Sequence, residues 1–258
     1  MWVKILLLFF VFSFLFKTDY SFNQDLGRHL KLGEIIWQSK AVPKLNLFSY
    51  TYPNFPFINS HWLFEVWAYL VSQSFDLQAL LILKLAVMLT AVCLVLLTIP
   101  NKSWLLLPIG FIFLHTLRER TELRPEIFSF LFTGLTLYIL EKYEKTKLIY
   151  LLPVIQLIWI NTHIYFIVGL ILQAIYLALH LRGVKLNLLA IIFVLSVAVS
   201  LINPSGLAGL LYPFDVTKNY GYTIVENQTM FLLESIEFKN PNLKFVKLSL
   251  AIAAFSLV

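Results

Sequence analysis

The sequence predicts an all-α polytopic membrane protein with about eight or nine hydrophobic helices. Hydrophobic residues make up 59% of the 258 residues and charged residues only 13%, whereas soluble domains are typically about 45–50% apolar. The mean hydropathy is +0.80. Apolar runs that approach the roughly 20 residues needed to cross a bilayer recur along nearly the whole chain. We therefore expect one transmembrane domain over residues 1–258 and no soluble domain of ordinary size.

Eight apolar segments are candidate spans. They cover residues 3–19, 77–99, 104–117, 126–141, 148–161, 164–181, 187–202 and 245–258. Lys4 precedes the first apolar run, but no small-residue cleavage site follows that run, which predicts an uncleaved helix with a cytoplasmic N-terminus. The last run stops at the end of the chain, so we expect the N-terminal module of something longer.

Short basic connections fix the expected orientation. They lie around Lys102, in "EKYEKTK" (141–147) and in "LRGVK" (181–185), and the positive-inside rule places them in the cytoplasm of a plasma (inner) membrane protein. The segments that we then expect on the outer, extracytoplasmic face are residues 20–61, 117–126, 160–163 and the long loop 203–244. The net charge of +6 is spread over these loops, so the bilayer, and no nucleic acid, is the expected partner.

This orientation requires residues 62–99 to cross the membrane once. The segment 61–75 reaches only about 20 Å as a helix, against a hydrocarbon thickness of about 30 Å. We therefore expect a half-inserted or interfacial helix, with Trp62, Trp67 and Tyr69 at headgroup level.

The outer loop 20–61 begins with "SFNQDLGRHLKLGEIIWQSK" (21–40), which has the pattern of a juxtamembrane amphipathic helix. Its apolar face would rest on the bilayer and carries Phe22, Leu26, Leu30 and Trp37. Asp25, Arg28 and His29 share another face, and Gly27 and Gly33 allow close approach of a neighbour. This polar face is either simply solvated or part of a site.

A second polar cluster lies between two apolar segments, in "RERTELRPE" (118–126). It contains Arg118, Glu119, Arg120, Glu122, Arg124 and Glu126. The cluster is either a salt-bridged turn or an anion site, because guanidinium groups match phosphate oxygens bidentately and acidic neighbours hold them in place.

Weaker polar features fall at the same predicted membrane level. His61 and Glu65 share one helical turn, and Asn161 and His163 follow the fifth candidate span. Each one alone is more often a cap or a satisfied polar group. Lys84 lies inside an apolar span, where an ionisable residue is either functional or snorkels to the outer surface.

The whole arrangement resembles the GT-C superfamily of polytopic glycosyltransferases, which take sugars from polyprenyl-phosphate carriers. The resemblance covers about residues 1–215, and it is carried by "NQDLGRHLKLG", "PFINSHWLFE", "LRPEIFSFLF" and "WINTHIYFIVG". It implies a first outer loop with juxtamembrane helices and an acidic catalytic residue near its start, here Asp25. It also implies acidic residues in the second outer loop, here Glu119 and Glu122.

What the resemblance implies for function is transfer of a sugar from a polyprenyl-phosphate donor to an acceptor glycan, lipid or protein. Asp25 and Glu122 would be catalytic, with Asp25 as the base or as a ligand to a divalent cation such as Mg²⁺ or Mn²⁺. The remaining expected site residues bind the substrate: Arg28, His29, His61, Glu65, Lys84, Glu119, Arg120, Arg124, Asn161 and His163.

Two other functions fit the same residues. A transporter or flippase for an anionic lipid or solute would use the arginines to bind its substrate without bond chemistry. A noncatalytic membrane scaffold of a polysaccharide-assembly system would use neither the acids nor the arginines for catalysis.

Overall fold

A computed structural model describes residues 2–16, 24–52, 54–100, 104–120, 122–181, 185–215 and 229–256. These residues form twelve α-helices and two short 3-10 helices. No strand occurs among them, and their β-pairing is limited to one isolated bridge between Leu45 and Pro56. The predicted all-α class is therefore confirmed.

The helices follow the apolar segments of the sequence. In the first half they are α1 (Trp2–Leu15), α2 (Gln24–Ser39), α3 (Trp62–Phe75), α4 (Leu77–Thr98), α5 (Leu106–His115) and η1 (Thr116–Glu119). In the second half they are α6 (Glu126–Glu141), η2 (Leu148–Leu151), α7 (Leu152–Thr162), α8 (Phe166–Leu179), α9 (Leu186–Val199), α10 (Leu207–Asp215), α11 (Met230–Ser235) and α12 (Asn242–Phe255).

Local sequence signals explain where the central helices begin and end. The Asp76 carboxylate accepts a hydrogen bond from the backbone N–H of Leu77 at 2.5 Å, so it caps α4. This helix ends at Thr98, just before Pro100. Pro153 stands in the first turn of α7, where its missing N–H costs nothing.

The described helices differ in length. α4 has 22 residues, which span about 33 Å, and it is the one described helix long and apolar enough to cross a bilayer. Shorter apolar helices run over Trp2–Leu15, Leu106–Arg118, Leu148–Thr162, Phe166–Leu179 and Leu186–Val199.

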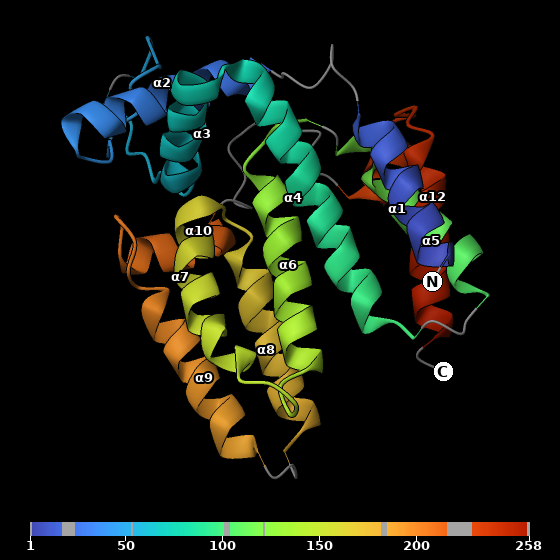
Figure 1. Ribbon diagram of the computed structural model, residues 1–258. Helices are drawn as coiled ribbons and strands as arrows, with labels where there is room; N and C mark the ends of the chain where they lie inside the picture. Colours follow the sequence, from blue (N-terminus) through green and yellow to red (C-terminus); the bar gives the residue numbers. More distant parts are fainter. Residues whose placement is uncertain are drawn as a thin grey trace.

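The helices form two groups, which Figure 1 shows side by side. One group is a bundle in which α4 packs on α6, α7 on α9, and α8 on both α6 and α9. The other consists of α1, α5 and α12, with α5 between its two neighbours. The helix α2 lies across one end of the bundle, and α3 packs between α2 and α7 (Figure 1).

We call that end of the molecule the site end. Contacts there join segments that are far apart in sequence: Asn161 Nδ2 donates to Ile202 O at 2.9 Å, and Asn242 Nδ2 donates to Thr116 O at 3.0 Å. The opposite end holds the starts of α1 and α9. There Lys4 Nζ donates to Ile99 O at 2.5 Å.

The predicted basic connections gather at this opposite end as far as they are described. Lys185 Nζ donates to Glu144 O at 2.8 Å, which joins the 181–185 and 141–147 connections. Lys102 and Arg182 lie outside the described residues. The predicted outer loop 203–244 is partly helical, because it contains α10 and α11; its residues 216–228 are also outside the described part.

The predicted faces of α2 are wrong for Leu26 and His29. Leu26 and His29 are both buried, so His29 points into the protein and not to the polar face that holds the exposed Arg28. Trp37 is exposed, with Lys40 Nζ 3.6 Å from its ring centroid. Phe22 is outside the described residues, and Leu30 is half-buried.

The buried face of α2 packs against α3 at very close range. A Cβ on Gly33 would lie 2.0 Å from the carbonyl oxygen of Glu65, so only glycine fits this crossing. Gly27, by contrast, has open space around it. The close approach expected of both glycines is therefore made at Gly33 alone.

The aromatic side chains of α3 contact neighbouring helices in the structure. Trp62 Nε1 donates to Asn161 Oδ1 at 2.8 Å. The ring of Trp67 meets that of Phe128 edge-on, with centroids 5.1 Å apart, and Tyr69 lies beside Gly33. This helix thus lies between α2 and the bundle, and Trp62, Trp67 and Tyr69 stay half-buried, so their position at headgroup level stays a prediction.

Candidate functional site

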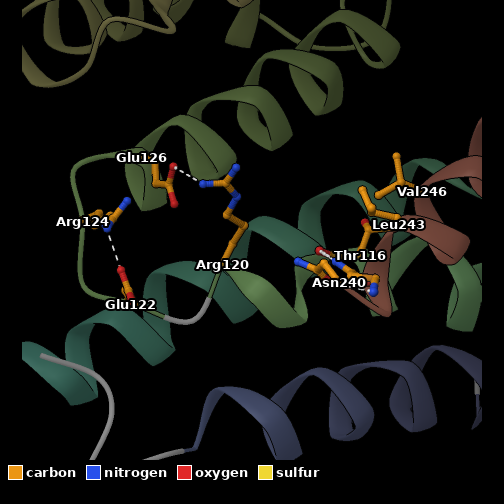
Figure 2. A pocket seen from close by; sticks show the side chains of 9 residues that line it. Thr116, Arg120, Glu122, Arg124, Glu126, Asn240, Leu243 and Val246 are labelled. Atoms are coloured by element: carbon orange, nitrogen blue, oxygen red, sulfur yellow. Dashed lines mark hydrogen bonds and ion pairs between the residues drawn. The ribbon is translucent and has the colours of Figure 1, made fainter. Parts of the chain in front are cut away.

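The arginine-rich turn between η1 and α6 carries two ion pairs. Arg124 Nε lies 2.8 Å from Glu122 Oε2, and Arg120 Nη1 lies 3.5 Å from Glu126 Oε2. Figure 2 shows the two pairs at neighbouring positions of the turn. Each guanidinium is paired with one carboxylate of its own turn.

Asp25 meets this turn from the first turn of α2. Its Oδ2 lies 3.7 Å from Arg124 Nη2, although 99 residues separate the two positions in the sequence. Arg124 is therefore shared between an acid of α2 and an acid of its own turn. The juxtaposition of Asp25 with the arginine cluster is the main geometric expectation of the sequence, and the structure contains it.

A pocket of about 370 Å³ opens beside the turn. Its walls are Thr116, Arg120, Glu122, Arg124, Glu126, Asn240, Asn242, Leu243 and Val246. In Figure 2 the arginines and acids stand on one side, and Thr116, Asn240, Leu243 and Val246 stand on the other. The pocket thus joins a wall of two arginines and two glutamates to amide and apolar walls, so an anion that binds there competes with the acids for the guanidinium groups.

A second polar cluster lies under α2, one helical turn from Asp25. His29 Nδ1 is 3.0 Å from Glu65 Oε1, and Asn59 Nδ2 donates to Glu65 Oε2 at 2.6 Å. The residues His29 and Glu65 are only 3% and 1% exposed. Because both carboxylate oxygens are paired, the buried charge is compensated and the ring of His29 is held in one orientation.

Two more imidazoles continue this cluster toward α6 and α7. The ring of His61 lies between those of His29 and His163, at centroid distances of 5.9 and 5.3 Å. His163 Nδ1 is 2.8 Å from Ser129 Oγ, which also accepts a hydrogen bond from Trp159 Nε1 at 2.8 Å. Side chains from four helices or their ends therefore fix this group.

The electrostatics keep two of these rings neutral. Burial lowers the pKa of His163 to about 3, and the nearby His29 adds to the shift. Burial also holds the pKa of His61 well below its usual range, with further contributions from His163, His29 and Arg28. Neutral imidazoles both donate and accept hydrogen bonds, so His163 shares a hydrogen bond with Ser129 without placing a charge in the interior.

The other expected site residues have different surroundings. Asn161 bonds Trp62 and the backbone, so it joins α3 to α7 and α9. Lys84 is 1% exposed within α4, so it does not snorkel to the outer surface. Arg28 is exposed on α2, and the side chain of Glu119 lies outside the described residues.

Sequence reasoning missed several polar residues of this end. Asn59 and Ser129 hold Glu65 and His163, and Asn240 and Asn242 line the pocket. Asn59 stands in the quoted stretch "PFINSHWLFE", where its position two residues before His61 was the available signal. Nothing in the sequence around Asn240 and Asn242 indicated that they belong to the site, because only the fold brings α12 to the arginine turn.

No group of three or more His, Cys, Asp or Glu side chains in the described part of the chain is placed to hold a metal ion. Asp25 and Glu122 both pair with Arg124. The divalent cation that the resemblance allows therefore stays an untested prediction.

Comparisons of the chain with protein-family models, with curated proteins and with solved structures gave no match. The geometry of the site end is therefore what supports a function for this protein.

Proposed function

We propose that this protein is a polytopic membrane glycosyltransferase of the GT-C type. It transfers a sugar from a polyprenyl-phosphate donor to an acceptor at the extracytoplasmic face of the plasma (inner) membrane. The observation that carries the proposal is the contact between Asp25 and Arg124. It places a carboxylate from the first outer segment next to an arginine pair that can hold a phosphate.

The outward surfaces of the bundle helices support the membrane setting. Ile82 of α4, Ile171 of α8 and Val194 of α9 are 71%, 50% and 63% exposed. Large apolar side chains stand out from α4, α7, α8 and α9, whereas soluble monomers rarely expose contiguous apolar surface beyond a few hundred Å². Lipid is the solvent that such a surface suits.

The reaction needs a base for the acceptor hydroxyl, cations for the departing phosphate and contacts for the sugar. The site end offers candidates for each. The acceptor hydroxyl attacks the anomeric carbon of the donor sugar, the bond from that carbon to the phosphate oxygen breaks, and the hydroxyl proton passes to a base. Asp25 is the proposed base, with Glu122 beside Arg124 as the second acid. A positioned base contributes about 10²–10⁴ in rate.

The arginines act on the departing polyprenyl phosphate. Its negative charge grows as the bond breaks, and guanidinium groups already held by carboxylates stabilise that charge without reorganising. Arg120 and Arg124 face the pocket together with Asn240 and Asn242. The neutral rings of His61 and His163, one turn of α2 away, are the proposed contacts of the sugar hydroxyls.

The direct test is incubation of the purified full-length protein with candidate polyprenyl-phosphate sugars and acceptors, followed by mass analysis. We expect released polyprenyl phosphate and a glycosylated acceptor. Asp25→Asn should abolish transfer and leave donor binding nearly unchanged. The matched control is Glu34→Gln, which alters an acid on the solvent side of the same helix and should transfer at the parent rate.

Two outcomes contradict this function. Transfer by Asp25→Asn at the parent rate removes Asp25 from catalysis. Accumulation of an anionic lipid or solute in vesicles, without any covalent product, favours a transporter instead.

A further inference from the structure

The segment between α2 and α3 forms a closed loop with an exposed, largely aromatic surface. Its two ends are joined by the bridge between Leu45 and Pro56 and by Phe57 N, which donates to Lys44 O at 2.9 Å. We call residues 44–57 the aromatic loop. Its exposed large side chains are Leu45, Leu47, Phe48, Tyr50, Tyr52 and Phe55, with Tyr50 99% and Tyr52 70% exposed. The rest of the protein therefore covers little of this surface.

The aromatic loop pairs backbone groups within itself. Asn46 N donates to Phe55 O at 2.9 Å, and Phe55 N donates to Tyr52 O at 3.2 Å. Tyr52 N donates to Ser49 Oγ at 3.0 Å. An unpaired backbone N–H is costly wherever water is scarce. These N–H groups keep their partners in such a layer, so the exposed side chains can enter it on a loop of fixed shape.

The helix α2, in contrast, turns its apolar face toward the protein. Leu32 and Ile36 are buried, and this side of the helix packs against α3. Arg28 and Lys31 are exposed. In the last turn Trp37 is also exposed. The exposed apolar surface of this part of the site end thus begins where α2 ends and lies on the aromatic loop.

The aromatic loop lies beside the bundle near the level where α4 begins. Figure 1 shows α2 at that level, and the chain between α2 and α3 lies on the side of the molecule away from α1 and α12. The helix α4 is long and apolar enough to cross a bilayer. In the proposed membrane its first turn marks the outer edge of the hydrocarbon, so the loop stands at the level of the outer headgroups.

The charges near the aromatic loop are basic. No Asp or Glu occurs between Glu34 and Glu65. Lys44 in the loop and Lys40 just before it are both exposed, and Lys40 Nζ lies 3.6 Å from the ring centroid of Trp37. Tyrosine and tryptophan are enriched at headgroup level, and lysines near a membrane surface attract anionic lipids. The loop therefore matches an anionic lipid surface in charge and in side-chain type.

We infer that the aromatic loop is an interfacial anchor, whose aromatic side chains enter the headgroup layer of the outer leaflet while Lys40 and Lys44 contact anionic lipid phosphates. The inference rests on the membrane setting of the proposed function and adds a lipid surface as the partner of this loop. The anchor fixes the far end of the helix that carries Asp25. An acceptor sugar fits the loop less well, because Ser39 lies about 21 Å from Asp25 along α2.

The depth of a spin label tests the anchor in the full-length protein, reconstituted in vesicles of phosphatidylcholine and phosphatidylglycerol. In a Cys93→Ser background, which lacks cysteine, the label is attached to Leu47→Cys or Tyr50→Cys. Oxygen concentrates in lipid, whereas a nickel chelate stays in water. We expect oxygen to relax both labels more than nickel does. Gln38→Cys, exposed on α2, is the matched control and should show the reverse order.

The basic residues are tested by combining Lys40→Gln with Lys44→Gln. The label at position 50 should lie closer to water in this variant when the vesicles contain phosphatidylglycerol, and at the parent depth in phosphatidylcholine alone. Equal depth in both kinds of vesicle contradicts the contact with anionic lipids. Stronger relaxation by nickel than by oxygen at positions 47 and 50 of the protein with both lysines overturns the inference. Protection from nickel that appears only with an added acceptor sugar, or only through contact of two copies, also overturns it.

The outcomes separate this inference from the proposed function. Labels in the lipid on a protein that transfers no sugar support the anchor and contradict the glycosyltransferase. Sugar transfer by a protein with both labels in water does the reverse.

Discussion

Glu65 is the residue on which the buried polar cluster depends, because its two oxygens hold His29 and Asn59. Replacing it by glutamine keeps the shape and removes the charge, which leaves His29 with a weaker partner in a buried place. We expect Glu65→Gln to lower the free energy of unfolding by about 1–3 kcal/mol.

Unfolding in mild detergent measures this loss. Glu34→Gln is the control, since the exposed pair of Glu34 with Lys31 contributes little. Equal stability of Glu65→Gln and the parent would mean that the His29–Glu65 contact is unimportant to the fold.

His163 predicts a pH dependence of stability. Its pKa is about 3 in the folded protein and about 6.5 in an unfolded chain, so the unfolded state binds more protons between these values. Stability is therefore lost as pH falls from about 6.5 toward 3, and His61 contributes with the same sign. The melting temperature of His163→Asn should fall less between pH 7.5 and 4.5 than that of the parent. Parallel curves would contradict the assignment.

At the scale of elements, the crossing of α2 over α3 positions both polar clusters. Gly33 makes the crossing possible, since its Cβ would meet the backbone of Glu65. We expect Gly33→Ala to cost about 1–3 kcal/mol through overpacking. Gly27→Ala, on the open side of the same helix, should be neutral or stabilise by up to about 1 kcal/mol. Equal effects of the two changes in a thermal melt would contradict the crossing.

The element bounds were predictable because continuous apolar runs fix them. Candidate span 126–141 coincides with α6, and 77–99 differs from α4 by one residue. The orientation of α2 was not predictable in the same way. His29 was grouped with the polar residues, and its partner Glu65 lies 36 positions away. A buried histidine looks like a solvated one until the fold supplies its carboxylate.

At the scale of the whole molecule, the two ends have different chemistry. The acids, arginines and histidines of the candidate site meet at one end, and Lys4 and Lys185 lie at the other. Pattern and charge in the sequence predicted this division, because the basic connections alternate along the chain with the polar clusters. The entry of α12 into the site, through Asn242 and Thr116, could not be predicted from a segment 126 residues away.

The proposed membrane orientation predicts opposite accessibility of these ends. In a Cys93→Ser background, which removes the sole cysteine, Ser39→Cys should react with an impermeant thiol reagent added outside intact cells. Thr146→Cys should react only after the membrane is opened. Both positions are exposed in the structure. Reaction of both from outside would contradict the orientation.

The most direct test of the central claim, that Asp25 and Arg124 act together on one lipid phosphate, is a double-mutant cycle on sugar transfer. The rates of the parent, Asp25→Asn, Arg124→Gln and the double variant are compared by mass analysis of released polyprenyl phosphate. We predict that the double variant loses about as much rate as the more damaged single variant, because residues that act as a unit are not additive. Losses that multiply independently, or a parent that releases no polyprenyl phosphate, would contradict the claim.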